Sequence, residues 1–225
     1  MDELRVVPTA DGSPTLYSER FNATYHSVNG ALTESMHVFI KSGFEAILLN
    51  KKTVEVLEVG MGTCLNAALT AWVAPKFGVK VHYSGIELFP PILEVLNSTG
   101  YQTVLEPECA DLWVKIVAAS AGDPVPVSPW FTVFKLYVDF ISWIPNQRYD
   151  LIYFDAFAPD DQPEMWSIDN FKKLFNALTP NGVLVTYSAK GLVKQNLRQA
   201  GFNVERLQGP PGKRHMVRAW KTPDH

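Results

Sequence analysis

The sequence predicts an α/β fold built on a mostly parallel, twisted sheet with a C-terminal antiparallel hairpin. From residue 53 onward, apolar runs of strand length alternate with segments of helical periodicity, which is the pattern of βαβ units. The run 54–59 leads directly into Gly60-Met61-Gly62, so a buried strand is followed by a glycine turn and a helix. Near the C-terminus, the short apolar segments 203–207 and 215–220 flank Gly209-Pro210-Pro211-Gly212 and predict a hairpin at the sheet edge.

The composition favours one domain in a soluble, cytoplasmic protein. A chain of 225 residues with 47% hydrophobic content can close one substantial core, and we expect residues 1–52 to form an extension that packs on a core domain, 53–225. The net charge of −3 disfavours nucleic-acid or membrane binding by the whole surface. No apolar run approaches the ~18 residues of a membrane span. Cys64 and Cys109 lack paired or metal-like spacing, so a disulfide is not expected. No metal is expected either, because His26, His37, His82 and His215 lack metal-ligand spacing.

The elements follow one another in a regular order. In the extension we predict an extended piece at 16–18 and a helix at 33–49, with Thr33 as its N-cap. Pro90 and Pro91 are expected in the first turn of a helix at 92–97. Segment 101–130 is less regular, and its proline-rich middle, 122–129, is incompatible with a helix or a central strand. The remaining expected elements are helix 65–77, strand 79–86, strand 131–138, strand 149–154, helix 168–178, turn 179–182, strand 183–187 and helix 191–199.

The first glycine turn is the predicted cofactor site. The third glycine of a dinucleotide fingerprint would fall at Leu65, so NAD and FAD are disfavoured, whereas the carboxylate of S-adenosylmethionine needs fewer glycines. An ordinary βα turn is the alternative. Glu87 ends the next strand, where an acid takes the ribose hydroxyls of an adenosine cofactor. Asp139 follows a third strand and is suited to the adenine amino group, or is a solvated loop carboxylate.

Asp155 is the predicted catalytic residue. It ends an apolar strand and precedes Phe157 and Pro159, so it could accept or orient an amine proton in a water-poor site; a helix cap or surface turn is the alternative. Because the carboxyl ends of parallel strands meet at one sheet edge, we expect Gly60, Glu87, Asp139 and Asp155 to converge. Phe157 and Trp166 could sandwich a planar base, although aromatic residues near a sheet are more often core.

The C-terminal stretch is locally basic. Gly212-Lys213-Arg214 favours phosphate binding, because a loop there presents two cations beside backbone amides; a solvated helix face and edge-protecting lysines are the alternative. The basic residues are Lys190, Lys194, Arg198, Arg206, Lys213, Arg214, Arg218 and Lys221.

In this order, the motifs resemble those of the methyltransferase domain of the MnmC family, including its stand-alone MnmD-like members. The resemblance runs from about 29 to 220 and is most specific at Asp155-Ala156-Phe157-Ala158-Pro159 and at Gly212-Lys213-Arg214-His215-Met216. Further matches are Pro163-Glu164-Met165-Trp166, the run 181–191, Ala200-Gly201-Phe202, Gly60-Met61-Gly62-Thr63, Glu87-Leu88-Phe89-Pro90 and the run 34–39. Cys64 is a departure, since family members often carry glycine there.

This resemblance implies a Rossmann-like class I S-adenosylmethionine-dependent methyltransferase. It would N-methylate 5-aminomethyl-(2-thio)uridine at the tRNA wobble position, giving 5-methylaminomethyl-(2-thio)uridine. The residues expected to bind the cofactor are Glu58, Gly60, Gly62, Glu87, Asp139 and Asp155, and those expected to bind the substrate are Phe157, Trp166, Lys190, Lys213 and Arg214. The FAD-dependent oxidase domain of larger relatives is not expected in this chain.

Two alternatives to this function stay open. The fold alone also permits a small-molecule or protein N-methyltransferase, and a non-catalytic nucleotide-binding module is possible in principle. The sequence does not indicate an oligomeric state.

Overall fold

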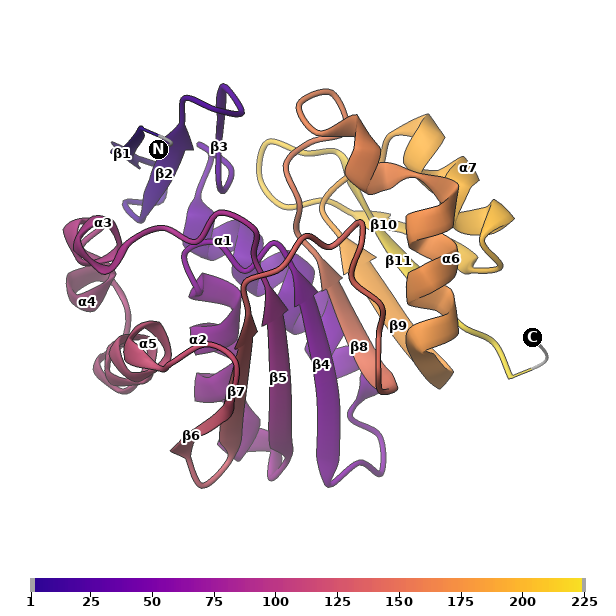
Figure 1. The fold of residues 1–225 in the computed structure, drawn as a ribbon, viewed down its shortest axis with the longest axis horizontal. Helices are drawn as coiled ribbons and strands as arrows, with labels where there is room; N and C mark the ends of the chain where they lie inside the picture. The colour runs from indigo at the N-terminus through magenta and orange to yellow at the C-terminus, as the bar shows by residue number, and fades with distance from the viewer. Residues whose placement is uncertain (1–2, 224–225) are drawn as a thin grey trace.

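A computed structural model describes residues 3–223 and places one eight-stranded sheet at the centre of the molecule (Figure 1). The five central strands run parallel, and the two edges are antiparallel. This confirms the predicted mostly parallel sheet with its C-terminal hairpin. In spatial order the strands are β10 (Asn203–Gln208), β11 (His215–Trp220), β9 (Leu178–Thr186), β8 (Tyr149–Phe154), β4 (Thr53–Val59), β5 (Lys80–Ile86), β7 (Phe131–Leu136) and β6 (Pro124–Ser128).

Helices cover both faces of the sheet because the central strands are apolar on both sides. Along β8, Leu151 and Tyr153 point into one core, while Ile152 and Phe154 point into the other. The first core packs against α2 (Leu65–Val73), with its short continuation η3 (Ala74–Phe77), and against α5 (Pro107–Ala118). The second packs against α6 (Ile168–Ala177) and α7 (Gly191–Gln199).

The N-terminal extension forms a small sheet and an irregular helix. Strands β1 (Leu4–Pro8), β2 (Pro14–Ser18) and β3 (Ala23–Thr24) pair in that order. The helix begins as α1 (Ala31–Ser35), widens to the π-helical η1 (Met36–Phe44) and ends as η2 (Glu45–Ile47). It packs against β8, β9 and α2. The division into an extension, 1–52, and a core, 53–225, stays a prediction, and residues 1–2 and 224–225 lie outside the described part.

The predicted N-cap of this helix is wrong. The helix begins at Ala31, and Thr33 lies inside it. Its backbone N–H and hydroxyl both donate to Oδ2 of Asp11, at 2.9 and 2.7 Å. A carboxylate from the β1–β2 loop therefore takes over a capping role that a local side chain was expected to fill.

Other segments also differ from prediction. Residues 107–118, expected to be irregular, form α5, whose Trp113 is fully buried and donates to the Thr63 carbonyl at 2.9 Å. Pro90 and Pro91 precede α3 (Leu93–Ser98) instead of occupying its first turn, and a short α4 (Tyr101–Val104) follows. The expected turn 179–182 is an irregular start of β9, where the register with β8 shifts. Within residues 3–223, no helix is long and apolar enough to cross a membrane.

Candidate active site

A cavity of about 360 Å³ opens at the carboxyl ends of β4, β5, β7 and β8. It brings together the residues that were expected to converge, because each follows the end of a parallel strand. The predicted site residues that line it are Gly60, Gly62, Glu87, Asp139, Asp155 and Phe157.

The glycine turn requires its first glycine. Gly60 has φ +88°, and a Cβ there would lie 2.5 Å from the Asp155 carbonyl oxygen. The backbone N–H groups of Gly60 and Met61 both donate to the Ile86 carbonyl at 3.0 Å, which fixes the turn to the end of β5. Cys64 adopts a left-handed φ of 64° and immediately precedes α2. The turn therefore forms with a cysteine at that position, at a cost of roughly 1–2 kcal/mol.

Glu87 spans the turn with both carboxylate oxygens. Oε2 accepts the N–H of Gly62 at 3.0 Å, and Oε1 accepts the N–H of Phe89 at 2.9 Å. Burial raises the pKa of Glu87, and these backbone donors oppose the rise. A carboxylate has about four acceptor sites, so each oxygen retains capacity for a ribose hydroxyl.

Asp155 is held at the end of β8 by its backbone and its side chain. Its N–H donates to the Val59 carbonyl at 2.9 Å, and its Oδ2 accepts from Nδ2 of Asn66 at 2.8 Å. Burial, the largest cause, raises the pKa of Asp155 to about 8; Glu34 adds to the rise, while Asn66 and Lys213 oppose it. A carboxyl with this pKa can exchange a proton near neutral pH.

Glu58 lies behind the cavity instead of lining it. It is fully buried. Its Oε1 accepts a hydrogen bond from the Asn66 side-chain amide and its Oε2 accepts one from the Tyr83 hydroxyl, each at 2.8 Å. The expectation that Glu58 contacts the cofactor therefore needs correction, because both of its carboxylate oxygens accept hydrogen bonds from protein side chains and the residue does not line the cavity. No role was predicted for Asn66, although a lone asparagine in the first turn of a mostly apolar helix is a sequence signal for a buried polar contact.

The aromatic contacts differ from the expected sandwich. Phe157 lines the cavity, stacks on Phe21 of the extension with centroids 4.3 Å apart, and meets the edge of Tyr25 at 5.1 Å. Trp166 is 1% exposed and donates from its indole to the Phe157 carbonyl at 2.8 Å. It supports the loop from within the core and cannot stack on a base where it lies, which corrects that prediction.

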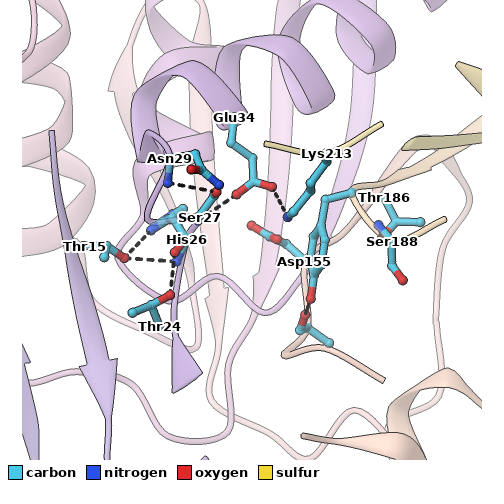
Figure 2. Close-up of polar contacts among 12 residues, drawn as sticks. Thr15, Thr24, His26, Ser27, Asn29, Glu34, Asp155, Thr186, Ser188 and Lys213 are labelled. Carbon is cyan, nitrogen blue, oxygen red and sulfur yellow. Dashed lines mark hydrogen bonds and ion pairs between the residues drawn. The ribbon is translucent and has the colours of Figure 1, made fainter. Parts of the chain in front are cut away.

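Several of the predicted basic residues form ion pairs with acidic side chains in different parts of the structure. Lys190 forms an ion pair with Asp160, and Arg214 is exposed on the loop between β10 and β11. Lys213 forms an ion pair with Glu34, beside Asp155 (Figure 2). Elsewhere in the stretch, Arg218 pairs with Glu205, and the ammonium of Lys221 donates to backbone carbonyls. Because several of these cations already have protein partners, the C-terminal stretch offers fewer of them to a phosphate than its sequence indicates.

Comparisons with known proteins identify the family. A family model described as S-adenosyl-L-methionine-dependent methyltransferase matches residues 133–222. The chain is 30% identical over 223 residues to the tRNA 5-methylaminomethyl-2-thiouridine biosynthesis bifunctional protein MnmC of Burkholderia multivorans, with 90% of this chain and 33% of that protein covered. The crystal structure of MNMC2 from Aquifex aeolicus matches with a TM-score of 0.79 and 25% identity, over 99% of this chain and 72% of that one. The chain belongs to the MnmC methyltransferase family.

Further relatives agree with this assignment. The MnmC protein of Burkholderia thailandensis is 30% identical over 234 residues, covering 95% of this chain and 35% of its own length. The chain thus spans about a third of the curated relatives it matches. A spermidine synthase from Thermotoga maritima, at 11% identity and a TM-score of 0.59 over 98% of this chain and 69% of that one, shares the fold.

This MnmC-family chain is an S-adenosylmethionine-dependent methyltransferase with a Rossmann-like fold. The site fits that cofactor. The cavity is within the usual size for a nucleoside cofactor, Gly60 and Gly62 line it without a side chain between their backbone and a ligand, and the Glu87 carboxylate, held by the Gly62 N–H, is of the kind that accepts from a diol.

Proposed function

We propose that this chain transfers the methyl group of S-adenosylmethionine to the exocyclic amine of 5-aminomethyl-(2-thio)uridine at the wobble position of tRNA. The observation that carries the proposal is Asp155, a partly buried carboxyl of raised pKa that lines the cavity and is oriented by Asn66. The names of the MnmC relatives support the substrate class.

The cofactor residues are also part of the proposal. Gly60 and Gly62 would hold the amino-acid end of the cofactor, Glu87 the ribose and Asp139 the adenine amino group. Asp139 lines the cavity and accepts the N–H of Ile141 at 2.9 Å, which keeps its carboxylate in place.

In this reaction the proposed role of Asp155 concerns one proton, that of the acceptor amine. When bound, S-adenosylmethionine supplies a methyl group activated by a positively charged sulfur, and its transfer forms a nitrogen–carbon bond while leaving a neutral thioether. The acceptor amine is protonated in water near neutral pH and is unreactive in that form. Asp155 accepts this proton or aligns the nitrogen lone pair, and Asn66 keeps its Oδ2 fixed while it does so. Phe157 and Phe21, which stack on each other, give the cavity an aromatic side.

Contact with tRNA would rest on exposed cations of the C-terminal region. Arg214 is exposed and directly follows Lys213, which pairs with Glu34, so it could meet phosphates that flank the wobble nucleotide. Lys190 would have to exchange Asp160 for a phosphate.

The direct test is methylation of tRNA from a deletion strain, followed by nucleoside analysis. We expect 5-aminomethyl-(2-thio)uridine to be converted to its methylaminomethyl form, with Asp155→Asn as the inactive control. Transfer only to small amines or to protein lysines would support the alternative N-methyltransferase. Cofactor binding without transfer to any acceptor would support a nucleotide-binding module.

A further inference from the structure

Lys213 places a primary ammonium among three groups that suit such an ion. Its Nζ forms an ion pair with Oε1 of Glu34 and lies 3.9 Å from the centre of the Tyr187 ring. Asp155 faces the same pair (Figure 2), and its pKa responds to both Glu34 and Lys213. A carboxylate, an aromatic face and a second carboxyl are the components of an alkylammonium cage.

The cage walls are held by bonds that do not involve Lys213. Oε2 of Glu34 accepts the N–H of Ser27 at 2.7 Å, and Glu34 is 5% exposed. The Tyr187 hydroxyl donates to the Ala156 carbonyl at 2.8 Å. Asp155 is fixed by Asn66. These three walls come from α1, the end of β9 and the end of β8, so the cage is preorganised for a cation.

The occupant, in contrast, comes from a surface loop. Lys213 lies in the 209–214 loop between β10 and β11, where Pro211, Gly212 and Arg214 are exposed. Its side chain keeps 29% of its surface exposed, against 7% for Glu34. A flexible lysine stem on such a loop can withdraw its ammonium without disturbing the sheet.

The cage adjoins the cofactor cavity. Asp155 belongs to both, and His26, which lines the cavity, interacts electrostatically with Glu34 and Lys213. Burial lowers the pKa of His26 to about 4, so the imidazole is neutral and does not compete as a cation at neutral pH. A primary ammonium in the cage would lie beside the residue that is proposed to take its proton.

We propose that Glu34, Tyr187 and Asp155 form the recognition cage for the primary ammonium of the methyl acceptor, and that Lys213 occupies this cage until the substrate displaces it. The inference rests on the proposed function, because the aminomethyl group is a primary alkylammonium like the lysine head. Lys213 then acts as an internal competitor. Once displaced, it is free to meet the RNA backbone.

The cofactor also carries a primary ammonium, on its methionine end. We assign the cage to the acceptor because Gly60 and Gly62 already offer the cofactor a turn inside the cavity. Calorimetry with S-adenosylhomocysteine separates the two sources. Lys213→Met should leave that affinity within about twofold of wild type, whereas a tenfold change would reassign the cage to the cofactor.

Chemical rescue tests the cage without any RNA. Lys213→Met leaves the buried Glu34 unpaired and should lower the melting temperature, and millimolar ethylammonium should restore it. Tetramethylammonium, which has no N–H donor, and sodium chloride of equal ionic strength should not. Lys172→Met, a change of the same kind on the exposed face of α6, is the control and should not respond to ethylammonium. If Lys213→Met does not fold, Lys213→Gln, which keeps a donor toward Glu34, takes its place.

Binding of 5-aminomethyluridine nucleoside tests the competition. In the presence of S-adenosylhomocysteine, Lys213→Met should bind the nucleoside at least about threefold more tightly than wild type, because the competitor is gone. Glu34→Gln should bind it more weakly. Absence of rescue together with weaker nucleoside binding in Lys213→Met would overturn the cage and leave the ion pair as a structural latch.

The two proposals fail in different ways. Rescue and tighter nucleoside binding without methylation of any tRNA would retain the cage and remove the proposed function. Methylation of tRNA without rescue by ethylammonium would retain the proposed function and remove the cage.

Discussion

Asn66 donates a hydrogen bond of 2.8 Å from its side-chain amide to Oδ2 of Asp155. The same nitrogen donates to the fully buried Glu58, whose other oxygen accepts from Tyr83. Burial raises the pKa of Glu58 well above its ordinary range, with Asp155 adding to the rise. The neutral side-chain amide of Asn66 on α2 thus connects the Asp155 carboxyl, at the end of β8, with Glu58 inside the sheet through two hydrogen bonds.

Asn66 is therefore expected to be a positioning residue. Asn66→Ala removes a donor that lowers the pKa of Asp155, so the midpoint of the pH–rate profile should rise by roughly one unit. Methyl transfer at pH 7 should fall by about tenfold. Asn176→Ala, an exposed asparagine on α6, is the matched control. An unchanged pH midpoint in Asn66→Ala would show that the bond does not tune Asp155.

The raised pKa of Asp155 also predicts how stability depends on pH. Its folded-state value of about 8 lies above the ordinary 3.8, so the folded protein holds a proton that the unfolded chain releases. This contribution is complete below about pH 4 and is lost as pH rises toward 8. Asp155→Asn removes the dependence. Denaturant unfolding should show the variant gaining at least about 1 kcal/mol relative to wild type between pH 5 and pH 8; a constant difference would mean that Asp155 is ionised throughout.

Glu87 is predicted to carry the ribose contact. Glu87→Ala would leave two buried hydroxyls without an acceptor, and S-adenosylmethionine binding should weaken by about 1–3 kcal/mol. Glu87→Gln, which keeps one oxygen acceptor, should lose less. Calorimetry on folded protein measures both. Unchanged affinity in the alanine variant, or tighter binding of NAD, would remove the cofactor assignment of this residue.

Arg214 separates RNA docking from chemistry. Arg214→Glu should raise the KM for tRNA and reduce the salt dependence of tRNA affinity by about one phosphate contact. Affinity for S-adenosylhomocysteine and for the free nucleoside should stay at the wild-type level. Wild-type kinetics on tRNA across salt concentrations would place the docking surface elsewhere on the molecule.

The sequence predicted the sheet well because its signals are local. Each central strand is an apolar run bounded by glycine, proline or polar residues, and parallel topology then brings Glu87, Asp139 and Asp155 to one edge. Helix α5 was missed because its neighbours are rich in proline and glycine, although Pro107 lies in its first turn, where proline is tolerated. The π-helical turn of η1 has no local signal of this kind.

The rest of the site depends on contacts between distant segments. Phe21, Tyr25 and Glu34 come from the extension, and their partners Phe157 and Lys213 lie far along the chain. No periodicity in the extension indicates such contacts. Trp166 was expected to stack on a base because it lies in a motif, but its burial depends on α6 and α7 packing around it. Motif position predicted which residues gather at the site better than it predicted what each one touches.

Single-turnover methylation of undermodified tRNA at saturating S-adenosylmethionine measures whether Asp155 takes or orients the proton of the acceptor amine. Asp155→Asn keeps the shape of the side chain but removes its basicity. We predict a rate lower by on the order of 10²-fold or more, with cofactor affinity little changed. A near wild-type rate in Asp155→Asn across neutral pH would contradict it and leave the amine to lose its proton to solvent.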